Sequence, residues 1–369
     1  MVVKISMLDQ IKEFINPSKN PDLSQAHEFQ RKHLPTLWLI GKTGAGKSSF
    51  IQAVTGHSSI EVGNGYAPCT MTAEVYEFPQ DKPVMRFLDT RGLGEADYNP
   101  NDDLEEISES GNSLVVVMKV DESEQSSVLE ALKQIKKKNK IKHLLLVHSA
   151  VLLSGHKELE RQITFNEKQV KGIWGKDFDA VAVDFEAGDG SVYNYDALIE
   201  KLTKILPVIG MMIEDKERST IEEENFDKVE NEVLWYAGSA SASDLIPAVG
   251  LVSVPAIQAK MLHSLANQYG VEWSTRTFSE LIGTLGSSFA LQYGVKLGAR
   301  QLVKFVPGYG QTVGAVTAAG VSFGTTYGLG RAACFYFYHK SKGETVSKEG
   351  MQSLYKDSFY KGKAASGYE

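Results

Sequence analysis

Residues 41–48 form a G-x-x-x-x-G-K-S pattern, whose residue types and spacing are those of a phosphate-binding loop. Glycines let backbone N–H groups turn inward around a phosphate chain, and a helix that follows adds its partial positive charge. In this pattern Lys47 is predicted to bridge the terminal phosphates, and the hydroxyl of Ser48 is predicted to ligate Mg²⁺. The residues predicted to contact the phosphates are Lys42, Thr43, Gly44, Ala45, Gly46, Lys47, Ser48 and Ser49.

The flanks of this loop agree with a phosphate site. An apolar run, Thr36–Ile40, precedes the loop and predicts a buried strand, while Lys47–Val54 predicts a helix. A glycine-rich loop between a strand and a helix is the context that the chemistry requires. A chance match in a structural turn is therefore the weaker interpretation.

A second motif, Asp89-Thr90-Arg91-Gly92, follows the apolar run Val84–Leu88. The carboxyl ends of parallel strands form the ligand-binding edge of an α/β sheet, so Asp89 is predicted to hold Mg²⁺ there. The N–H of Gly92 is predicted to sense a γ-phosphate. Arg91 has two interpretations, a stabiliser of transition-state charge or an exposed loop arginine.

Between these motifs lies a glycine-rich loop, residues 63–70, which ends just before a predicted strand. Thr70 is predicted to complete Mg²⁺ coordination through its hydroxyl, and Thr72 is the second choice. A turn that is merely capped by Thr70 remains the alternative.

The elements that must position these residues alternate between short apolar runs and helical patterns, which predicts an α/β sheet wound with helices. Further strands are expected at 73–78, 113–119, 143–147 and 180–183, and further helices at 102–110, 126–137, 157–171 and 196–206. The predicted organisation is a helical lead-in at 1–33, the α/β domain at 34–210, a connecting helix at 211–238, a Gly/Ala-rich helical domain at 239–340 and a loosely ordered polar tail at 341–369.

The quoted motifs GKTGAGKSS, GNGYAPCT and LDTRGLGE resemble the Era- and septin-like P-loop GTPases. The chain is more similar to bacterial GTPases that carry a C-terminal helical domain of unknown function, some of them inner-membrane proteins. The resemblance implies binding of GTP and GDP with Mg²⁺, and hydrolysis of the β–γ phosphoanhydride. It also implies a cytoplasmic protein, with the cytoplasmic face of the inner membrane and a homo-oligomer as further expectations.

The sequence departs from this family where guanine is read. GTPases usually carry Asn/Thr-Lys-x-Asp after the fifth strand, but here Val147–Val151 contain no Asp. The later Ser-Ala motif is also absent, and Val183–Glu186 occupy its approximate place. His148 has two interpretations, contact with a base edge or a cap on the strand. Guanine, adenine and relaxed specificity all remain open.

Leu93 stands where Ras-like enzymes have the glutamine that positions the attacking water. Hydrolysis is therefore expected to be slow. The alternative is a nucleotide-binding scaffold with negligible turnover.

The C-terminal region contains an uncharged stretch, Phe305–Gly330, which exceeds the ~20 residues needed to span a bilayer. Pro307 and many glycines weaken its apolar character. Gly324 and Gly328 form a small-residue face for close helix packing, with Leu281–Ala299 as the suggested partner. A bundle that docks on a membrane or another subunit, and a hairpin that inserts, both remain open.

Composition and charge limit which partners and which redox compartment are expected for this chain. A formal net charge of −7 argues against a nucleic-acid partner. Two cysteines, Cys69 and Cys334, have no pairing or metal-ligand spacing, which favours a reducing compartment. The basic run 136–140 ends a predicted helix, where a solvated end and contact with anionic lipid are the two interpretations.

Overall fold

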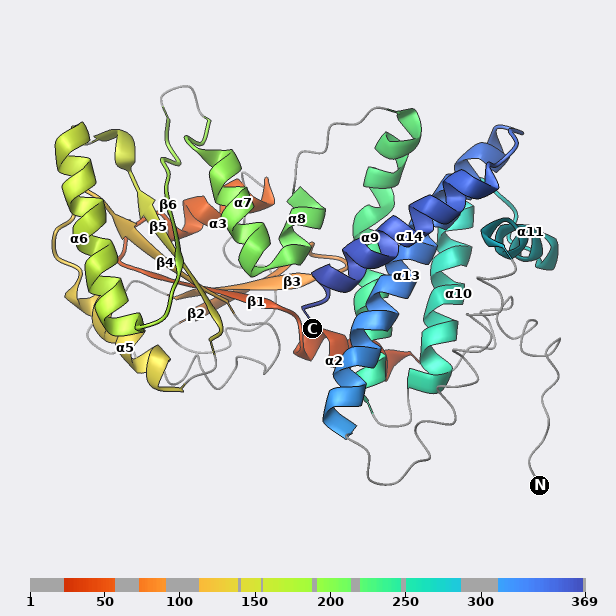
Figure 1. The fold of residues 1–369 in the computed structure, drawn as a ribbon, viewed down its shortest axis with the longest axis horizontal. Coiled ribbons are helices and arrows are strands. Elements are labelled where there is room, and N and C mark those ends of the chain that lie inside the picture. The colour runs from red at the N-terminus through yellow and green to blue at the C-terminus, as the bar shows by residue number, and fades with distance from the viewer. Residues whose placement is uncertain are drawn as a thin grey trace. The chain divides into compact units, whose positions relative to one another are not determined.

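The computed structural model describes residues 23–56, 73–90, 113–138, 141–153, 155–187, 191–213, 220–246, 250–286 and 311–367. The chain divides into two compact units. The sheet unit is His33–Asp215, and the helical unit combines Met1–Lys32 with Lys216–Glu369. Figure 1 labels their helices and strands.

The sheet unit is an α/β fold, as predicted. Its strands are β1 (Thr36–Gly41), β2 (Ala73–Phe78), β3 (Met85–Thr90), β4 (Ser113–Lys119), β5 (His143–Ser149) and β6 (Asp179–Ala182). Its helices are α3 (Lys47–Thr55), α5 (Ser126–Lys138), the 3-10 helix η2 (Val151–Leu153), α6 (His156–Trp174), α7 (Tyr195–Ile205) and α8 (Pro207–Ile213). The predicted strands at 73–78 and 113–119 are confirmed to the residue, and the others differ by one or two residues at their ends.

The six strands run in the order β2-β3-β1-β4-β5-β6. All neighbouring pairs are parallel except β2 with β3. In the register of β1 with β3, Leu39 pairs with Asp89, and in that of β1 with β4, Gly41 pairs with Val117. The phosphate loop and Asp89 therefore leave neighbouring strands at the same carboxyl edge.

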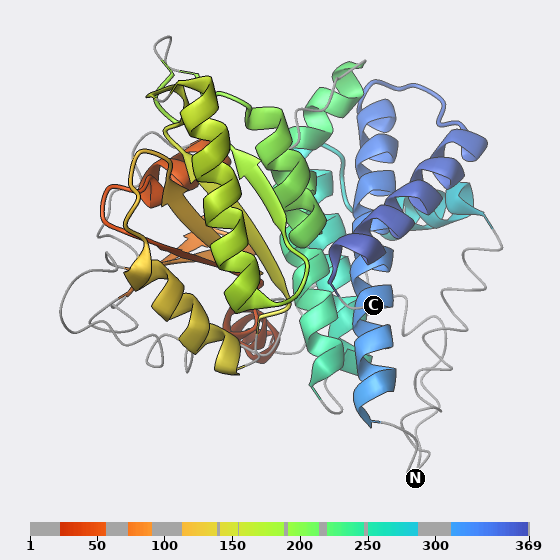
Figure 2. The same cartoon turned by 60° about the vertical axis from the view of Figure 1, so that its left-hand side comes forward.

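Helices cover both faces of this sheet. Alternate residues of β1, β4 and β5, among them Trp38, Val116 and Leu146, form one core cluster with α5 and α6. Figure 2 shows α5 and α6, in yellow, in front of the strands. The intervening residues, such as Leu39 and Val117, point the other way and are also fully buried, so these strands are apolar throughout.

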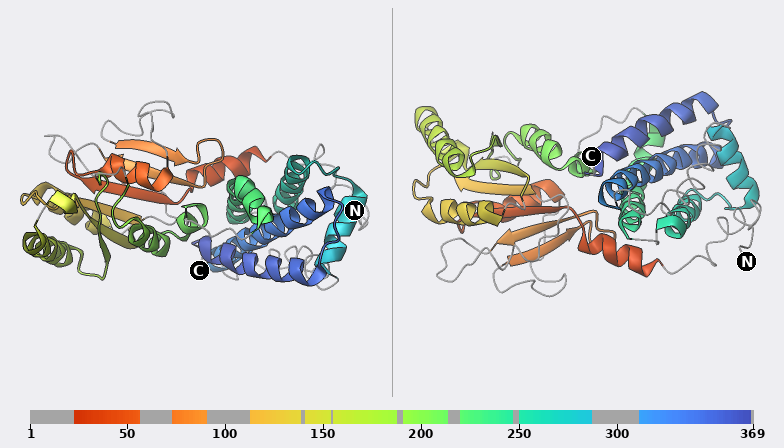
Figure 3. Two further views of the ribbon diagram at one scale, coloured as in Figure 1. Left: turned by 90° about the horizontal axis from the view of Figure 1, so that it is seen from above. Right: turned by 60° about the horizontal axis from the view of Figure 1, so that its bottom comes forward.

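The helical unit consists of α2 (Ser24–Lys32), α9 (Ile221–Leu245), α10 (Gly250–Gln268), α11 (Thr275–Leu285), α13 (Gln311–Ser341) and α14 (Lys348–Ala365). Both views of Figure 3 show α13 beside α9 and α14. The first of these helices, α2, packs on α9, where the Gln30 amide donates to the Trp235 carbonyl at 3.1 Å. Helix α9 begins with a capping box at Thr220.

Buried polar pairs join α13 to α9. The Arg331 guanidinium donates to both oxygens of Glu222 at 2.6 and 2.7 Å, and both side chains are 9% exposed. One turn away, the Tyr327 hydroxyl donates to Glu230 at 2.6 Å. Because a buried charge is costly without its partner, these pairs fix the register of the two helices.

The predicted small-residue face of α13 does pack against a helix, but its partner is α14. A Cβ at Gly324 would lie 2.6 Å from the Phe359 carbonyl oxygen, and one at Gly328 would lie 3.0 Å from that of Tyr355. The expectation of a loosely ordered tail is therefore wrong for Lys348–Ala365. Small residues on both helices, including Gly362, let the two backbones approach closely.

Within the described ranges, no helix is both long enough and apolar enough to cross a bilayer. The helices expected at 102–110 and in the first residues of the chain lie outside those ranges, as do most of 281–299 and the beginning of the 305–330 stretch.

Candidate functional site

Three glycines shape the turn between β1 and α3. A Cβ at Gly41 would lie 2.6 Å from the Val117 carbonyl oxygen, so β1 ends at a position that excludes a side chain. Gly44 and Gly46 have φ of +75° and +97°, values that favour glycine. A Cβ at Gly44 would meet no described atom within 4 Å, so this side of the loop is open to a ligand.

The start of α3 is arranged for an anion. Gly46 is the N-cap and has no side chain that could accept from the first amides of the helix. These N–H groups and the helix dipole therefore present positive potential to the loop. Thr43, in the loop, and Ser48, in the first turn of α3, are both exposed.

Lys47 holds its ammonium over the same loop. The side chain is buried, and its Nζ donates to the carbonyl of Gly41 at 3.0 Å and to that of Lys42 at 3.2 Å. Burial lowers the pKa of Lys47, while the negative charge of Asp89 opposes that shift. The lysine thus lies over the loop, at the edge of the sheet where β3 carries Asp89 and where phosphate oxygens are expected.

Asp89 and Ser48 fit a magnesium ion. Asp89 lies near the end of β3, in register with Leu39 of β1, and is close enough to act electrostatically on Lys47. Ser48 lies in the first turn of α3. Carboxylate and hydroxyl oxygens are hard ligands of the kind that Mg²⁺ takes alongside phosphate oxygens.

Lys42, within the loop, is held by two carboxylates that precede α5. Its Nζ forms ion pairs with Glu122 and, at 2.9 Å, with Glu124, and these partners raise its pKa. Glu124 also accepts from the N–H of Ser126 at 2.9 Å, in the first turn of α5. The side chain of Lys42 is therefore engaged within the sheet unit, and its contact with nucleotide stays a prediction.

Ser149 is a residue of this site that the sequence did not single out. Its hydroxyl donates to the carbonyl of Ala45 at 2.7 Å, which ties the end of β5 to the phosphate loop. Next to it, Asp184 accepts from the N–H of Leu152 at 3.0 Å and from that of Glu186 at 3.1 Å. The available signal was position, because Ser149 lies two residues beyond the predicted strand 143–147 and is the last residue of β5 in the structure.

The neighbouring His148 faces the other side of the sheet. Its ring is 1% exposed, and its Nε2 lies 3.9 Å from a carboxylate oxygen of Glu167 on α6. Burial lowers the pKa of His148 to about 4, so the ring is neutral at pH 7. Contact of His148 with a base edge stays a prediction.

Other predicted residues lie outside the described ranges. These are the switch threonine Thr70, its alternative Thr72, and the loop residues Arg91 and Gly92. Their roles stay predictions.

Comparison with known proteins agrees with this geometry. Residues 36–149 match the family described as 50S ribosome-binding GTPase. Magnetosome membrane protein 22 of Magnetospirillum gryphiswaldense is 30% identical over 140 residues, which cover 37% of this chain and 70% of that protein.

Solved structures show weaker similarity. Toc33 from Arabidopsis thaliana, crystallised as a dimerization-deficient mutant, is 16% identical, with a TM-score of 0.36, over 51% of this chain and 94% of Toc33. The elongation factor SelB of Methanococcus maripaludis, in complex with a GTP analogue, is 13% identical, with a TM-score of 0.33, over 47% of this chain and 34% of SelB.

The family match covers the strand, loop and helix that carry the phosphate site, together with Asp89 and the end of β5. The chain therefore belongs to the family that includes magnetosome membrane protein 22, and residues 36–149 form its GTP-binding P-loop GTPase domain.

Proposed function

We propose that the chain is a slow, Mg²⁺-dependent GTPase. The observation that supports this most is the position of Lys47, whose ammonium lies over the loop carbonyls at the edge of the sheet that also carries Asp89. A lysine, a carboxylate and a helix N-terminus at one edge match the parts that position and neutralise a triphosphate.

Hydrolysis at this site transfers the γ-phosphoryl group to water and releases GDP and inorganic phosphate. Mg²⁺, which Ser48 and Asp89 would hold, would supply positive charge at the phosphate oxygens. Lys47 and the first amides of α3 bind the same oxygens and stabilise their charge in the transition state. Leu93 has no group that can orient the attacking water, which explains why turnover is expected to be slow.

The test is magnesium-dependent release of phosphate by the purified chain. Thr70→Ala and Asp89→Ala are each expected to reduce turnover more than the matched substitution Thr72→Ala. A larger loss from Thr72→Ala would move the switch role to that residue. Turnover that is equal with and without Mg²⁺ would contradict the proposed enzyme.

A second candidate function is a nucleotide-dependent scaffold with negligible turnover and relaxed base specificity. The segment Val147–Val151 contains no base-reading Asp, and Leu152, which directly follows it, is 54% exposed. The nearby carboxylate of Asp184 accepts from two backbone N–H groups and so shapes this turn.

Side-by-side binding of GTP, GDP, ATP and ITP separates the two candidates. ITP lacks the 2-amino group of guanine, so a site without a base-reading carboxylate binds GTP and ITP about equally. A strong preference for GTP over ITP, with measurable turnover, would favour the first candidate.

We also propose that the nucleotide state controls membrane association at the cytoplasmic face of the inner membrane. Support comes from the name of the relative, a membrane protein, and from the uncharged stretch Phe305–Gly330. The full chain is expected to sediment with lipid vesicles. High salt releases a docked bundle, whereas an inserted hairpin resists carbonate. A monodisperse chain that does not bind vesicles would contradict both docking and insertion.

A further inference from the structure

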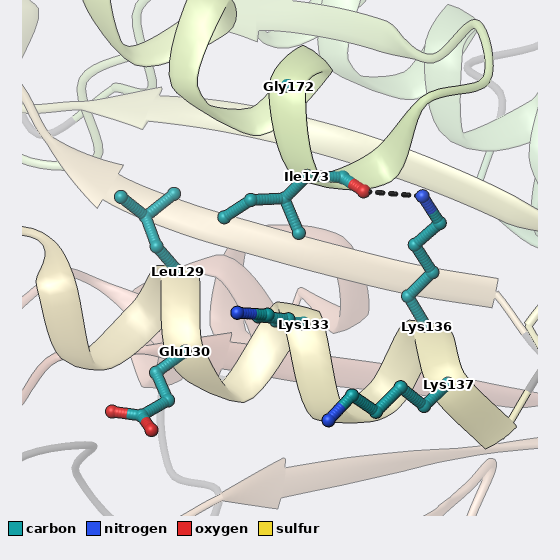
Figure 4. Close-up of a pocket in the computed structure, with 7 residues that line it drawn as sticks. All are labelled: Leu129, Glu130, Lys133, Lys136, Lys137, Gly172 and Ile173. Carbon is teal, nitrogen blue, oxygen red and sulfur yellow. Dashed lines mark hydrogen bonds between the residues drawn. The ribbon is translucent and has the colours of Figure 1, made fainter.

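A groove with a volume of about 670 Å³ lies between α5 and α6 of the sheet unit. Figure 4 shows that its residues come from α5, between Leu129 and Lys137, and from the last turn of α6. Leu129 and Ile173 form its apolar part, and both pack against the buried core. Three lysines, Lys133, Lys136 and Lys137, surround that apolar part.

The lysines differ in what they contact. Lys136 donates to the Ile173 carbonyl at 2.6 Å and so caps the C-terminal end of α6. Lys133 and Lys137 are exposed and four residues apart, on one face of α5. Among the described residues neither forms an ion pair, and Glu130 is the one carboxylate lining the groove. Two cations are thus left beside an apolar floor, in a chain whose formal net charge is −7.

We propose that this groove binds the headgroup phosphate of an anionic phospholipid at a membrane surface. Lys133 and Lys137 pair with the phosphate oxygens, and the apolar floor of Leu129 and Ile173 contacts the glycerol and upper acyl region. The inference rests on the membrane association proposed above, and it assigns part of that association to the sheet unit.

The groove is separate from the nucleotide site. The first turn of α5, at Ser126, is tied to the phosphate loop through Glu124 and Lys42. Lys133 and Lys137 lie further along the same helix, roughly 10–16 Å at 1.5 Å per residue. GTP and lipid can therefore be bound together, and loss of one site does not remove the other.

The test measures sedimentation of the full chain with two kinds of vesicle, pure phosphatidylcholine and phosphatidylcholine containing phosphatidylglycerol. The wild-type chain is expected to bind the second kind more strongly. At about five-fold per lysine, Lys133→Gln with Lys137→Gln should reduce that gain on the order of twenty-five-fold, and added salt should also reduce it.

The matched control is Lys157→Gln with Arg161→Gln. It removes two exposed cations at the same four-residue spacing on α6, outside the groove. This control should keep the gain, and both double variants should keep wild-type GTP affinity. Equal losses in the two variants would mean that net charge alone acts, which overturns the proposal.

Two further results overturn the proposal and separate it from the proposed function. If phosphatidylcholine binding persists without any gain from phosphatidylglycerol, the groove assignment fails while membrane association stands. If neither vesicle binds but polyglutamate does, the groove fits an acidic protein instead. In both cases GTP binding and turnover, measured on the same samples, still report on the P-loop.

Discussion

The sheet unit and the helical unit use their charged side chains in opposite ways. In the sheet unit, Ser48 is exposed and Asp89 half-buried at the carboxyl edge, and the buried Lys47 donates to loop carbonyls rather than to a carboxylate. In the helical unit, Arg331 and Glu222 are buried and bind each other. Substitutions at the site should therefore change binding, whereas those in the helical unit should change stability.

The buried pair in the helical unit gives the largest expected effect. Arg331→Met leaves Glu222 buried without its partner, which should cost about 3–5 kcal/mol of that unit's unfolding free energy. Hydrogen exchange of the α9 and α13 amides measures the loss. Adding Glu222→Leu should recover most of it, and a single substitution without effect would contradict the role of the pair.

Lys47 tests the expectation for the sheet unit, that a substitution at the site changes binding rather than stability. Lys47→Ala removes charge-assisted contacts with phosphate, so GTP affinity should fall by about 3 kcal/mol, which is more than a hundredfold. Thermal stability should hold or rise, because burial disfavours this ammonium. Fluorescent-nucleotide titration and calorimetry measure the two quantities. Unchanged affinity would remove the phosphate-loop assignment.

The close contact between α13 and α14 tests whether packing, as well as buried charge, determines the stability of the helical unit. Gly324→Ala places a Cβ 2.6 Å from the Phe359 carbonyl oxygen, and overpacking should cost about 1–3 kcal/mol. The matched control is Gly283→Ala in α11, where the added Cβ meets no described atom within 4 Å. Denaturant unfolding should show the control neutral or slightly stabilised. Equal effects would mean that helix propensity alone is at work.

His148 gives the smallest effect and is a buried titratable group of the sheet unit. Its pKa is 6.5 in the reference state and about 4 in the fold, because burial disfavours the charged ring. The unfolded chain therefore takes up a proton first, and stability is lost as the pH falls from 6.5 towards 4.

At pH 5.5 that loss is about 1 kcal/mol relative to pH 7.5. His148→Leu should remove it, as measured by urea unfolding at both pH values. His143→Gln, at the exposed end of the same strand, should retain it. An identical pH dependence in the wild type and His148→Leu would exclude this histidine as the cause.

Much of the sheet unit was predictable from local pattern. Short apolar runs such as Ser113–Lys119 match strands because both faces of the sheet are covered, and the loop at 41–48 carries its own glycine and lysine spacing. The meeting of Asp89 with this loop was also predictable, since parallel strands bring their carboxyl ends to one edge. These features depend on residues close in sequence or on a general rule of topology.

Only the tertiary structure decided which distant faces meet. The sequence pattern of α14 predicted a polar tail rather than a packed helix. The reason is that its buried side consists mainly of small residues with little hydrophobic signal, among them Ser358, Gly362 and Ala365. Its packing against α13 depends on close backbone approach. Likewise, Lys136 and Ile173 are far apart in the chain, and their contact follows from how α5 and α6 cover one face of the sheet. Such contacts depend on three-dimensional shape, which local residue pattern does not encode.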